Sequence, residues 1–199
     1  MYELFRQGGP LMWPLLGCSV LALGIFLTKL LYFARLRSDA AGLFREVIGL
    51  VQNGEFSDAA TLCQRSASPL AKVTSAVLRL KGQSRDQIKT IAKEVAGRES
   101  GPLERYLGLL STIATISPLI GLLGTVLGMI QAFHVIAEQG VGTPATLGGG
   151  ISQALLTTAA GLSVAIPTIL AHRYLNDRMQ RLIVDLEEYV LRVVDQVGR

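Results

Sequence analysis

The sequence predicts an all-α integral membrane protein with three transmembrane helices and long cytoplasmic helical extensions. Two uncharged windows, residues 106 to 137 and 139 to 172, lie on either side of Glu138. Each is longer than the ~20 apolar residues that cross a bilayer core. A third uncharged stretch, residues 7 to 28, lies near the N-terminus. Hydrophobic residues make up 50% of the 199 positions and charged residues only 17%, which is atypical of a soluble domain.

The first predicted span covers residues 11 to 33 and includes Lys29 near its end. The aliphatic stem of this lysine can lie along apolar surface while its ammonium reaches the lipid headgroups. A cleaved signal peptide is the competing interpretation. It is disfavoured because the apolar region is too long, Arg35 and Arg37 follow it, and no A-x-A cleavage pattern is present.

Lys and Arg residues are distributed unevenly between the two sides of the predicted spans. Twelve lie between the first and second spans and five lie after the third, whereas Arg6 alone precedes the first span. The positive-inside rule therefore places the N-terminus outside and the C-terminus in the cytoplasm. In chain order we expect an N-terminus on the outside (1–10), a first span (11–33), a cytoplasmic helical region (34–105), a second span (106–136), an outside loop (137–147), a third span (148–171) and a cytoplasmic C-terminal helix (172–199).

The cytoplasmic region has the turn and capping signals of short helices. An Asn53-Gly54 turn separates two expected helices, residues 42 to 51 and 55 to 64. Pro69 precedes a third expected helix that ends near Gly82. Ser84 and Gln87 then form a predicted capping box for a helix that runs through Glu99, kinks at Gly101-Pro102 and continues into the second span.

Apolar residues of the C-terminal segment recur at spacings of 4, 3, 4, 3 and 4, which is a heptad pattern. Such a stripe can pack against copies of the chain or against residues 38 to 100 of the same chain, and the sequence leaves both alternatives open. The stripe consists of Leu175, Met179, Leu182, Leu186, Tyr189 and Val193.

Small and hydroxyl residues recur at helical spacing in the second and third spans. The simplest interpretation is that glycines allow close helix contact and that hydroxyls bond to carbonyls one turn earlier. Their concentration on two consecutive spans favours a hydroxyl-lined interface that meets a polar guest. The second span contributes Ser117, Gly121, Gly124, Thr125 and Gly128 with Pro118, and the third contributes Gln153, Thr157, Thr158, Gly161, Val164 and Thr168 with Pro167.

Several chemistries are disfavoured by what the spans lack. They contain no Asp, Glu or Arg, so a proton relay would need a carboxylate supplied by a partner. An enzyme is not expected, because Ser152 and Ser163 have no His at comparable depth to serve as a base. Cys18 and Cys63 form no CxxC motif, so we expect neither a metal site nor a cofactor. Nucleic-acid binding is also not expected, since acids are interleaved with the basic residues.

Two sequence runs in these spans, Ser117 to Phe133 and Gly149 to Pro167, resemble the paired signature of the MotA/TolQ/ExbB proton channel family. Three spans with an outside N-terminus resemble its ExbB/TolQ branch, because MotA-type subunits have four. The resemblance implies a bacterial inner membrane, so that the outside loop and the N-terminus are periplasmic. It also implies a homo-pentameric ring in the membrane lipid that encloses an ExbD- or TolR-like partner with one span and an intramembrane Asp. Proton flow would then deliver force to a TonB- or TolA-like protein.

By motif position, the resemblance makes Thr125 and Thr158 pore-facing hydroxyls near the partner's aspartate. Gln153 occupies a position where many relatives have Glu, and Thr157 and Ser117 complete the predicted polar lining. The alternatives are a TolQ-like subunit for envelope maintenance, a motility motor, or a scaffold that does not conduct; the coupling ion could be H+ or Na+. Helix packing is the predicted role of Gly121, Gly124, Gly128, Gly161, Pro118 and Pro167.

Overall fold

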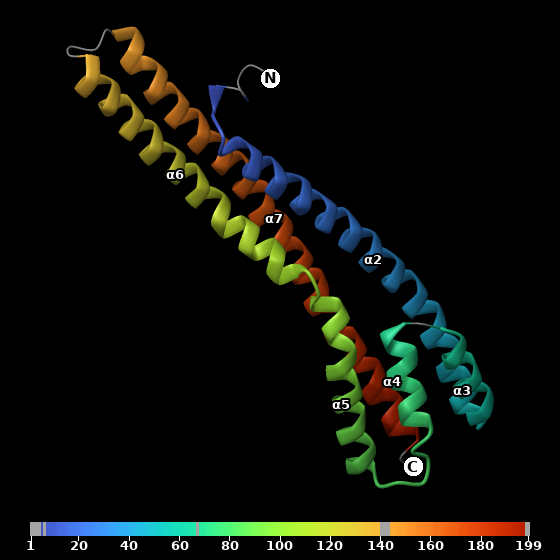
Figure 1. Cartoon of the computed structure of the whole chain (residues 1–199). Coiled ribbons are helices and arrows are strands. Elements are labelled where there is room, and N and C mark those ends of the chain that lie inside the picture. The colour runs from blue at the N-terminus through green and yellow to red at the C-terminus, as the bar shows by residue number, and fades with distance from the viewer. Residues whose placement is uncertain (1–4, 6, 67, 140–143, 198–199) are drawn as a thin grey trace. The chain divides into compact units, whose positions relative to one another are not determined.

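The structure is a computed structural model that describes residues 5, 7–66, 68–139 and 144–197 (Figure 1). The regular elements in this part of the chain are α-helices, which confirms the all-α prediction. Residues 140–143 of the predicted periplasmic loop, Gly142 among them, lie outside the described residues. In chain order the helices are α2 (Met12–Gln52), α3 (Phe56–Arg65), α4 (Pro69–Leu78), α5 (Arg85–Glu104), α6 (Leu107–Gln139) and α7 (Pro144–Val197).

Three of these helices are long and apolar enough to cross a membrane. The candidate spans are Met12–Leu36 in α2, Leu107–Glu138 in α6 and Gly148–Asp195 in α7, the last being longer than one bilayer crossing. Helix α2 begins one residue after the predicted start of the first span. The chain is therefore a multi-pass membrane protein built from three spanning helices.

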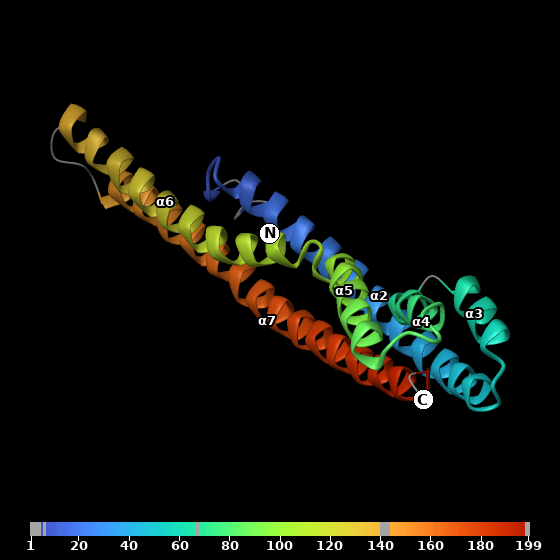
Figure 2. The ribbon, with the colours of Figure 1, turned by 90° about the horizontal axis from the view of Figure 1, so that it is seen from below.

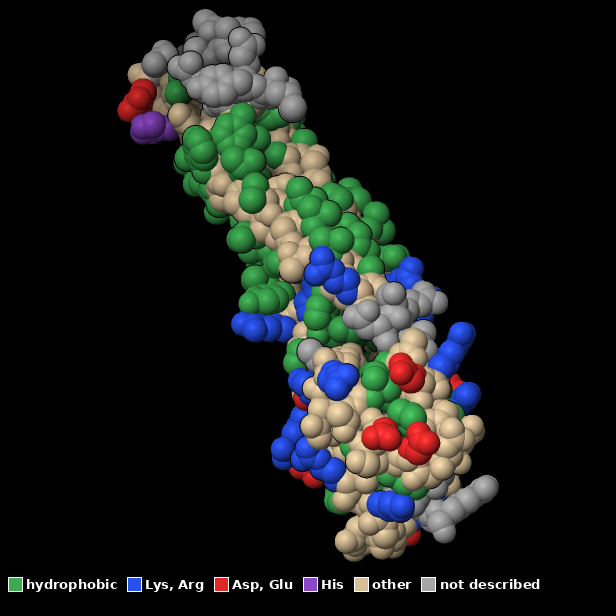
Figure 3. Space-filling model, turned by 90° about the vertical axis from the view of Figure 1, so that its right-hand side faces the viewer, with side chains coloured by type: hydrophobic (Ala, Val, Ile, Leu, Met, Phe, Trp, Pro, Cys, Tyr) green, Lys and Arg blue, Asp and Glu red, His purple; other side chains and the backbone are tan. Residues whose placement is uncertain are grey.

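The chain divides into two compact units, and both α2 and α7 contribute to each. The span unit comprises Met1–Leu27 with Tyr106–Tyr174, and the charged unit comprises Thr28–Arg105 with Leu175–Arg199. On the face shown in Figure 3, apolar side chains cover most of the span unit, whereas Lys, Arg, Asp and Glu side chains gather on the charged unit. Apolar side chains such as Leu155 and Leu170, both 64% exposed, are suited to contact lipid.

The charged unit has a conventional aliphatic core. Val73, Val77, Ile88 and Val193 are 0% exposed, which means that α4, α5 and the end of α7 pack on one another. Burial also raises the pKa of the Cys63 thiol to about 11. Core residues from five helices form this cluster: Phe44, Val47, Val51, Ala59, Cys63, Leu70, Ala71, Val73, Val77, Leu78, Ile88, Ala92, Leu186, Val190, Val193 and Val194.

The heptad stripe of the C-terminal segment packs within its own chain. Leu186 and Val193 belong to the core of the charged unit, and Tyr189 stacks on Phe44 with ring centroids 4.0 Å apart. Of the two alternatives that the sequence left open, the structure therefore favours packing against residues 38 to 100.

Two expected helix boundaries differ from the structure. Residues 42 to 51 are not a separate helix but the last part of α2, because no proline interrupts the chain between Leu15 and Gln52. The capping box of Ser84 and Gln87 is confirmed. Helix α5 passes through Pro102 and ends at Glu104.

The expected continuation of this helix into the second span was therefore wrong. A proline near the end of a helix removes one N–H donor, and the helix can still pass through it. A residue with positive φ takes the backbone out of the right-handed helical conformation and so ends the helix. Tyr106 is that residue, since its φ of 69° ends the helical repeat before α6 begins.

Lys29 also departs from its expected role. Its side chain is 6% exposed, and its ammonium donates hydrogen bonds of 3.0 Å to the carbonyl oxygens of Pro102 and Leu103. The rings of Tyr32 and Phe33 lie within 5.5 Å of the same nitrogen. The ammonium contacts the end of α5 instead of extending to headgroups, because the last carbonyls of a helix need donors and attract positive charge.

Candidate functional site: the polar contact between α6 and α7

Glycines of α6 let its backbone approach α7 closely. A Cβ atom added to Gly121 would lie 3.1 Å from the Cα of Thr158, and one added to Gly128 would lie 2.8 Å from the Cβ of Ala154. The two helices run side by side over this stretch in both ribbon views (Figures 1 and 2). Any larger residue would push the helices apart, because helix contacts in membranes depend on such close packing.

Helix α7 contributes a glycine to the same contact. A Cβ added to Gly161 would lie 2.7 Å from the carbonyl oxygen of Ser117 and 3.0 Å from the Cα of Gly121, and both of these are backbone atoms. Gly124 faces Thr157, whose Cγ2 would lie 2.5 Å from an added Cβ. The structure thus places the four glycines predicted for packing at the α6–α7 contact.

The hydroxyl groups at this contact make two kinds of hydrogen bond. Ser117 is fully buried, and its hydroxyl donates to the carbonyl of Ile113 at 2.7 Å, one turn earlier in α6. Thr158 instead donates across the contact to the carbonyl of Gly121 at 2.8 Å. Thr157, which is 1% exposed, lies between α6 and α7 where Gly124 leaves space for it. Ser117, Thr157 and Thr158 therefore meet in one polar helix contact.

Thr125 and Gln153 lie at the edges of the contact. Thr125 is half-buried, and its hydroxyl donates to the carbonyl of Leu122 at 2.6 Å within α6. Gln153 is also half-buried, and its amide nitrogen lies against Gly9, which precedes α2. These two side chains are accessible to a further chain, whereas Ser117 and Thr157 are enclosed within the span unit.

Two prolines lie inside the spanning helices. Pro118 of α6 is half-buried and Pro167 of α7 is exposed. Each lacks the N–H that would bond the carbonyl four residues earlier in its helix. Such carbonyls at membrane depth require a neighbouring donor or water, so each proline leaves one acceptor in its helix for a donor other than the backbone.

The contact holds polar groups but almost no charge. Between Leu107 and Ala171, the only carboxylate among the described residues is Glu138, and it lies 3.1 Å from the Nε2 atom of His134 near the end of α6. The described residues also contain no cluster of three or more His, Cys, Asp or Glu side chains suited to a metal ion. Hydroxyls, amides and carbonyls can exchange hydrogen bonds, but they cannot hold an excess proton near neutral pH.

Sequence reasoning missed the part of the site that lies before α2. Gly8 is buried, and its carbonyl accepts a hydrogen bond of 2.9 Å from the hydroxyl of Thr157. The Gly8-Gly9-Pro10 run is a turn signal that could have drawn attention to this segment. Nothing in the sequence pairs that turn with residue 157, because the contact joins positions 149 residues apart.

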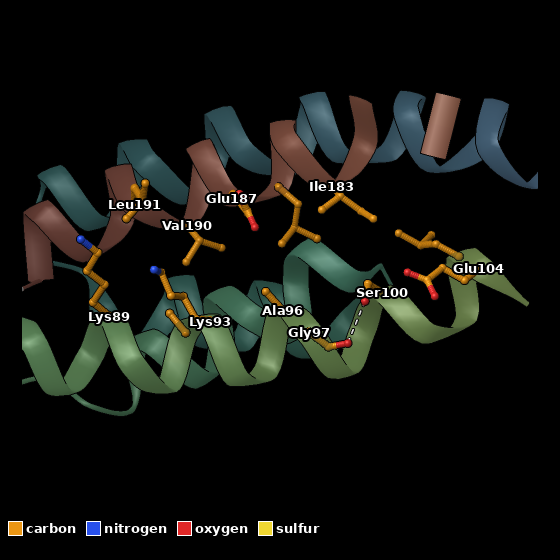
Figure 4. A pocket seen from close by; sticks show the side chains of 13 residues that line it. Lys89, Lys93, Ala96, Gly97, Ser100, Glu104, Ile183, Glu187, Val190 and Leu191 are labelled. Atoms are coloured by element: carbon orange, nitrogen blue, oxygen red, sulfur yellow. Dashed lines mark hydrogen bonds between the residues drawn. The ribbon is translucent and has the colours of Figure 1, made fainter. Parts of the chain in front are cut away.

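The charged unit contains a separate groove of about 410 Å³ between α5 and α7 (Figure 4). Its lining combines apolar side chains such as Val190 with Lys89 and Lys93 of α5 and Glu187 of α7. None of the predicted pathway or packing residues lines this groove, although Leu186 of the heptad stripe does.

A family model described as the MotA/TolQ/ExbB proton channel family matches residues 65–188 of the chain. The matched region covers all of α4, α5 and α6, and α7 as far as Glu188. It therefore includes the whole α6–α7 contact described above.

Individual relatives with ExbB names are similar over most of the chain, and a TolQ relative is similar over less than half of it. An ExbB-like biopolymer transport protein of Synechocystis sp. is 33% identical over 165 residues, which cover 82% of this chain and 79% of the relative. The biopolymer transport protein exbB1 of Vibrio cholerae is 31% identical over 192 residues, covering 94% and 84%. The Tol-Pal system protein TolQ of Pseudomonas aeruginosa is 41% identical over a shorter stretch of 86 residues, covering 43% and 37%.

Proposed function

This chain belongs to the MotA/TolQ/ExbB proton channel family, and on that premise we propose that it is the multi-span subunit of an inner-membrane complex driven by the proton motive force. Its homologues include both ExbB and TolQ proteins, so it is a transport subunit of the proton-channel type. Within the proposed complex it forms the wall of the proton pathway.

A polar helix contact without a carboxylate supports this function most directly. Ser117, Thr157 and Thr158 supply hydroxyls at the α6–α7 contact, yet nothing there can carry a proton on its own. A charge at the bilayer centre is unfavourable by ~2.5–3.5 kcal/mol on insertion scales. A partner's aspartate would therefore stay protonated against lipid and could ionise only beside hydroxyls and water. The hydroxyls of this chain and the aspartate of the partner would together supply the groups that a proton pathway needs.

The proposed partner is an ExbD- or TolR-like protein with one span and an intramembrane Asp. Thr125 and Gln153 are half-buried in the single chain, which leaves them available to such a helix. Transfer of one elementary charge through 100 mV releases ~2.3 kcal/mol. That is enough to bias the rotation of a helix if protonation and position are coupled.

The proposed assembly is a homo-pentameric ring around the partner helices. Large apolar side chains of α6 remain exposed in the single chain, Leu119 at 58% and Leu122 at 57% among them, and either lipid or a second copy can cover them. The excess of Lys and Arg between the first two spans and in the tail supports a periplasmic N-terminus and a cytoplasmic C-terminus.

For the energised system, we favour force transfer to a TonB-like protein for outer-membrane transport. The relatives that match most of this chain carry ExbB names, whereas the TolQ relative matches less than half of it. A TolA-like protein in envelope maintenance is the second candidate.

The decisive experiment reconstitutes the chain in liposomes that carry an imposed pH gradient and a pH-sensitive dye. We expect the chain alone to give no flux above that of empty liposomes, and the chain with an ExbD-like partner to conduct. Loss of flux when the partner's aspartate is replaced by Asn would support the pathway. Sustained flux through the chain alone would contradict it.

Thr125→Val tests the pathway against a scaffold that does not conduct. The change nearly keeps the side-chain volume but removes the hydroxyl. A pathway role predicts loss of flux with normal assembly, and Thr112→Val, at an exposed threonine near the start of α6, serves as the matched control. Equal flux in the parent and both variants would favour the scaffold.

A further inference from the structure

The segment before α2 forms a turn that packs on α7 within the span unit. Gly8 is buried, and its carbonyl lies 2.9 Å from the hydroxyl of Thr157. At the start of the same segment, Phe5 makes an edge-to-face contact with Trp13, with ring centroids 5.1 Å apart. The turn is therefore held both to the first turns of α2 and to the polar contact of α7.

The hydroxyl of Thr157 has two acceptors within reach. It lies 2.8 Å from the carbonyl of Gln153, in its own helix, and 2.9 Å from the carbonyl of Gly8. A hydroxyl has one proton to donate, so the two carbonyls share or exchange it. The turn thus competes with α7 for the donor that faces Gly124 of α6.

Two features of the structure disfavour any residue other than glycine at position 9. Its φ of +74° lies in the left-handed region that disfavours residues with a Cβ. A Cβ built there would also overlap the side-chain amide nitrogen of Gln153, so this amide would have to move. Gly8 differs in its backbone, because its φ lies outside the left-handed region; its added Cβ would meet only the side chain of Met12, at 2.6 Å, which can also move.

We propose that Gly9 is a positioning residue for the polar pathway, and that it acts by fixing the side-chain amide of Gln153. The turn closes one side of the space around Gln153, and its Gly8 carbonyl engages the neighbouring Thr157 hydroxyl. The N-terminal segment thereby orients the amide of Gln153 and the hydroxyl of Thr157. This inference rests on the proposed function, since the affected residues are those of the proton pathway.

A double-mutant cycle between Gly9→Ala and Gln153→Ala tests the proposal in liposomes that contain the chain and its ExbD-like partner. We expect Gly9→Ala to reduce proton flux by about tenfold in the parent and by less than about twofold in the Gln153→Ala background, where no amide is left to displace. Gly17→Ala is the control, because a Cβ at that α2 position meets nothing within 4 Å. An equal fold-loss in both backgrounds would overturn the proposal, because Gly9 would then act without Gln153.

A second measurement needs no proton flux. Backbone strain at φ +74° accompanies Gly9→Ala in either background, so the difference between backgrounds isolates the overlap with Gln153. The thermal midpoint in detergent should fall by several degrees in the parent and by about half as much or less with Gln153→Ala. Equal shifts would place Gln153 away from the turn and overturn the inference. If the complex shows no flux at all, the proposed function fails while this thermal cycle still decides the role of Gly9.

Discussion

Helices pack through small residues in the span unit and through large apolar residues in the charged unit. In the span unit, Gly121, Gly128 and Gly161 place backbone against backbone, and Thr158 bonds across the contact. In the charged unit, large and branched aliphatic side chains such as Ile88 fill the space between helices. Both units are helical, so secondary structure does not account for the difference.

The difference in packing follows from the surroundings of each unit. Each apolar side chain that a helix removes from water stabilises the folded state, so large buried side chains stabilise the charged unit. A helix in lipid gains little by exchanging lipid for leucine, and close approach and hydrogen bonds hold it instead. Substitutions should therefore have opposite size dependence: removing volume destabilises the charged unit, and adding volume destabilises the span unit.

Ile88→Ala should have the largest effect and tests the charged unit. Ile88 is 0% exposed within the aliphatic core, so its truncation leaves a cavity and lowers the free energy of unfolding by ~2–5 kcal/mol. Denaturant unfolding in mild detergent measures this loss. Val184→Ala, at a position that is 61% exposed, should change it little. Similar losses at the two positions would mean that burial does not stabilise this unit.

Gly161→Ala tests the opposite rule in the span unit. The added methyl group would meet the backbone carbonyl of Ser117 at 2.7 Å, which no rotamer can relieve, so we expect a loss of ~1–3 kcal/mol. Gly108→Ala in α6 is the matched control, because a Cβ there meets nothing within 4 Å. The readout is the folded fraction recovered in detergent. A neutral Gly161→Ala would remove the size contrast between the units.

Lys29→Met tests an electrostatic contact that belongs to the charged unit although Lys29 lies in a spanning helix. The ammonium caps the carbonyls of Pro102 and Leu103, and its removal should destabilise the last turn of α5 by ~1–2 kcal/mol. Hydrogen exchange of the amides near the end of α5 should accelerate. Lys93→Met, on the exposed face of α5, should leave their exchange unchanged. Unchanged exchange with Lys29→Met would show that the cap contributes nothing.

Thr158→Val should have the smallest effect on stability, and it tests whether the hydroxyl at the α6–α7 contact serves packing or proton flux. The hydroxyl bond to Gly121 crosses the helix contact, and such bonds in membrane proteins contribute ~0.6 kcal/mol on average. We expect a small shift in unfolding together with loss of proton flux in the complex. Ser163→Val, whose hydroxyl bonds within α7, should leave flux intact. A large loss of stability without loss of flux would assign Thr158 to packing alone.

Local signals predicted much of the architecture. The uncharged windows around Glu138 located α6 and α7, and the spacing of Ser84 and Gln87 located the start of α5. The recurrence of Gly121 and Gly128 predicted a face of close helix contact on α6, and in the structure α7 packs against it. These features are fixed by residues within a few turns of one another, which is why a sequence pattern can carry them.

Contacts between distant segments could not be predicted in this way. The sequence gives no sign that Gly9 lies against Gln153, or that Lys29 caps α5, because those partners are far apart in the chain. The left-handed Tyr106 was also missed, since a tyrosine carries no local preference for positive φ. In each case tertiary packing decided the structure at that residue.

The core of the charged unit joins Phe44 and Val47, from the end of α2, to Val190 and Val193, from the end of α7. During translation, the ribosome makes the first pair 146 residues before the second, at about 5–20 residues per second. Both the second and third spans are therefore synthesised, and can enter the bilayer, before this core can close. Until then, the nascent chain exposes an aliphatic surface that chaperones can bind, and the end of α7 completes the fold.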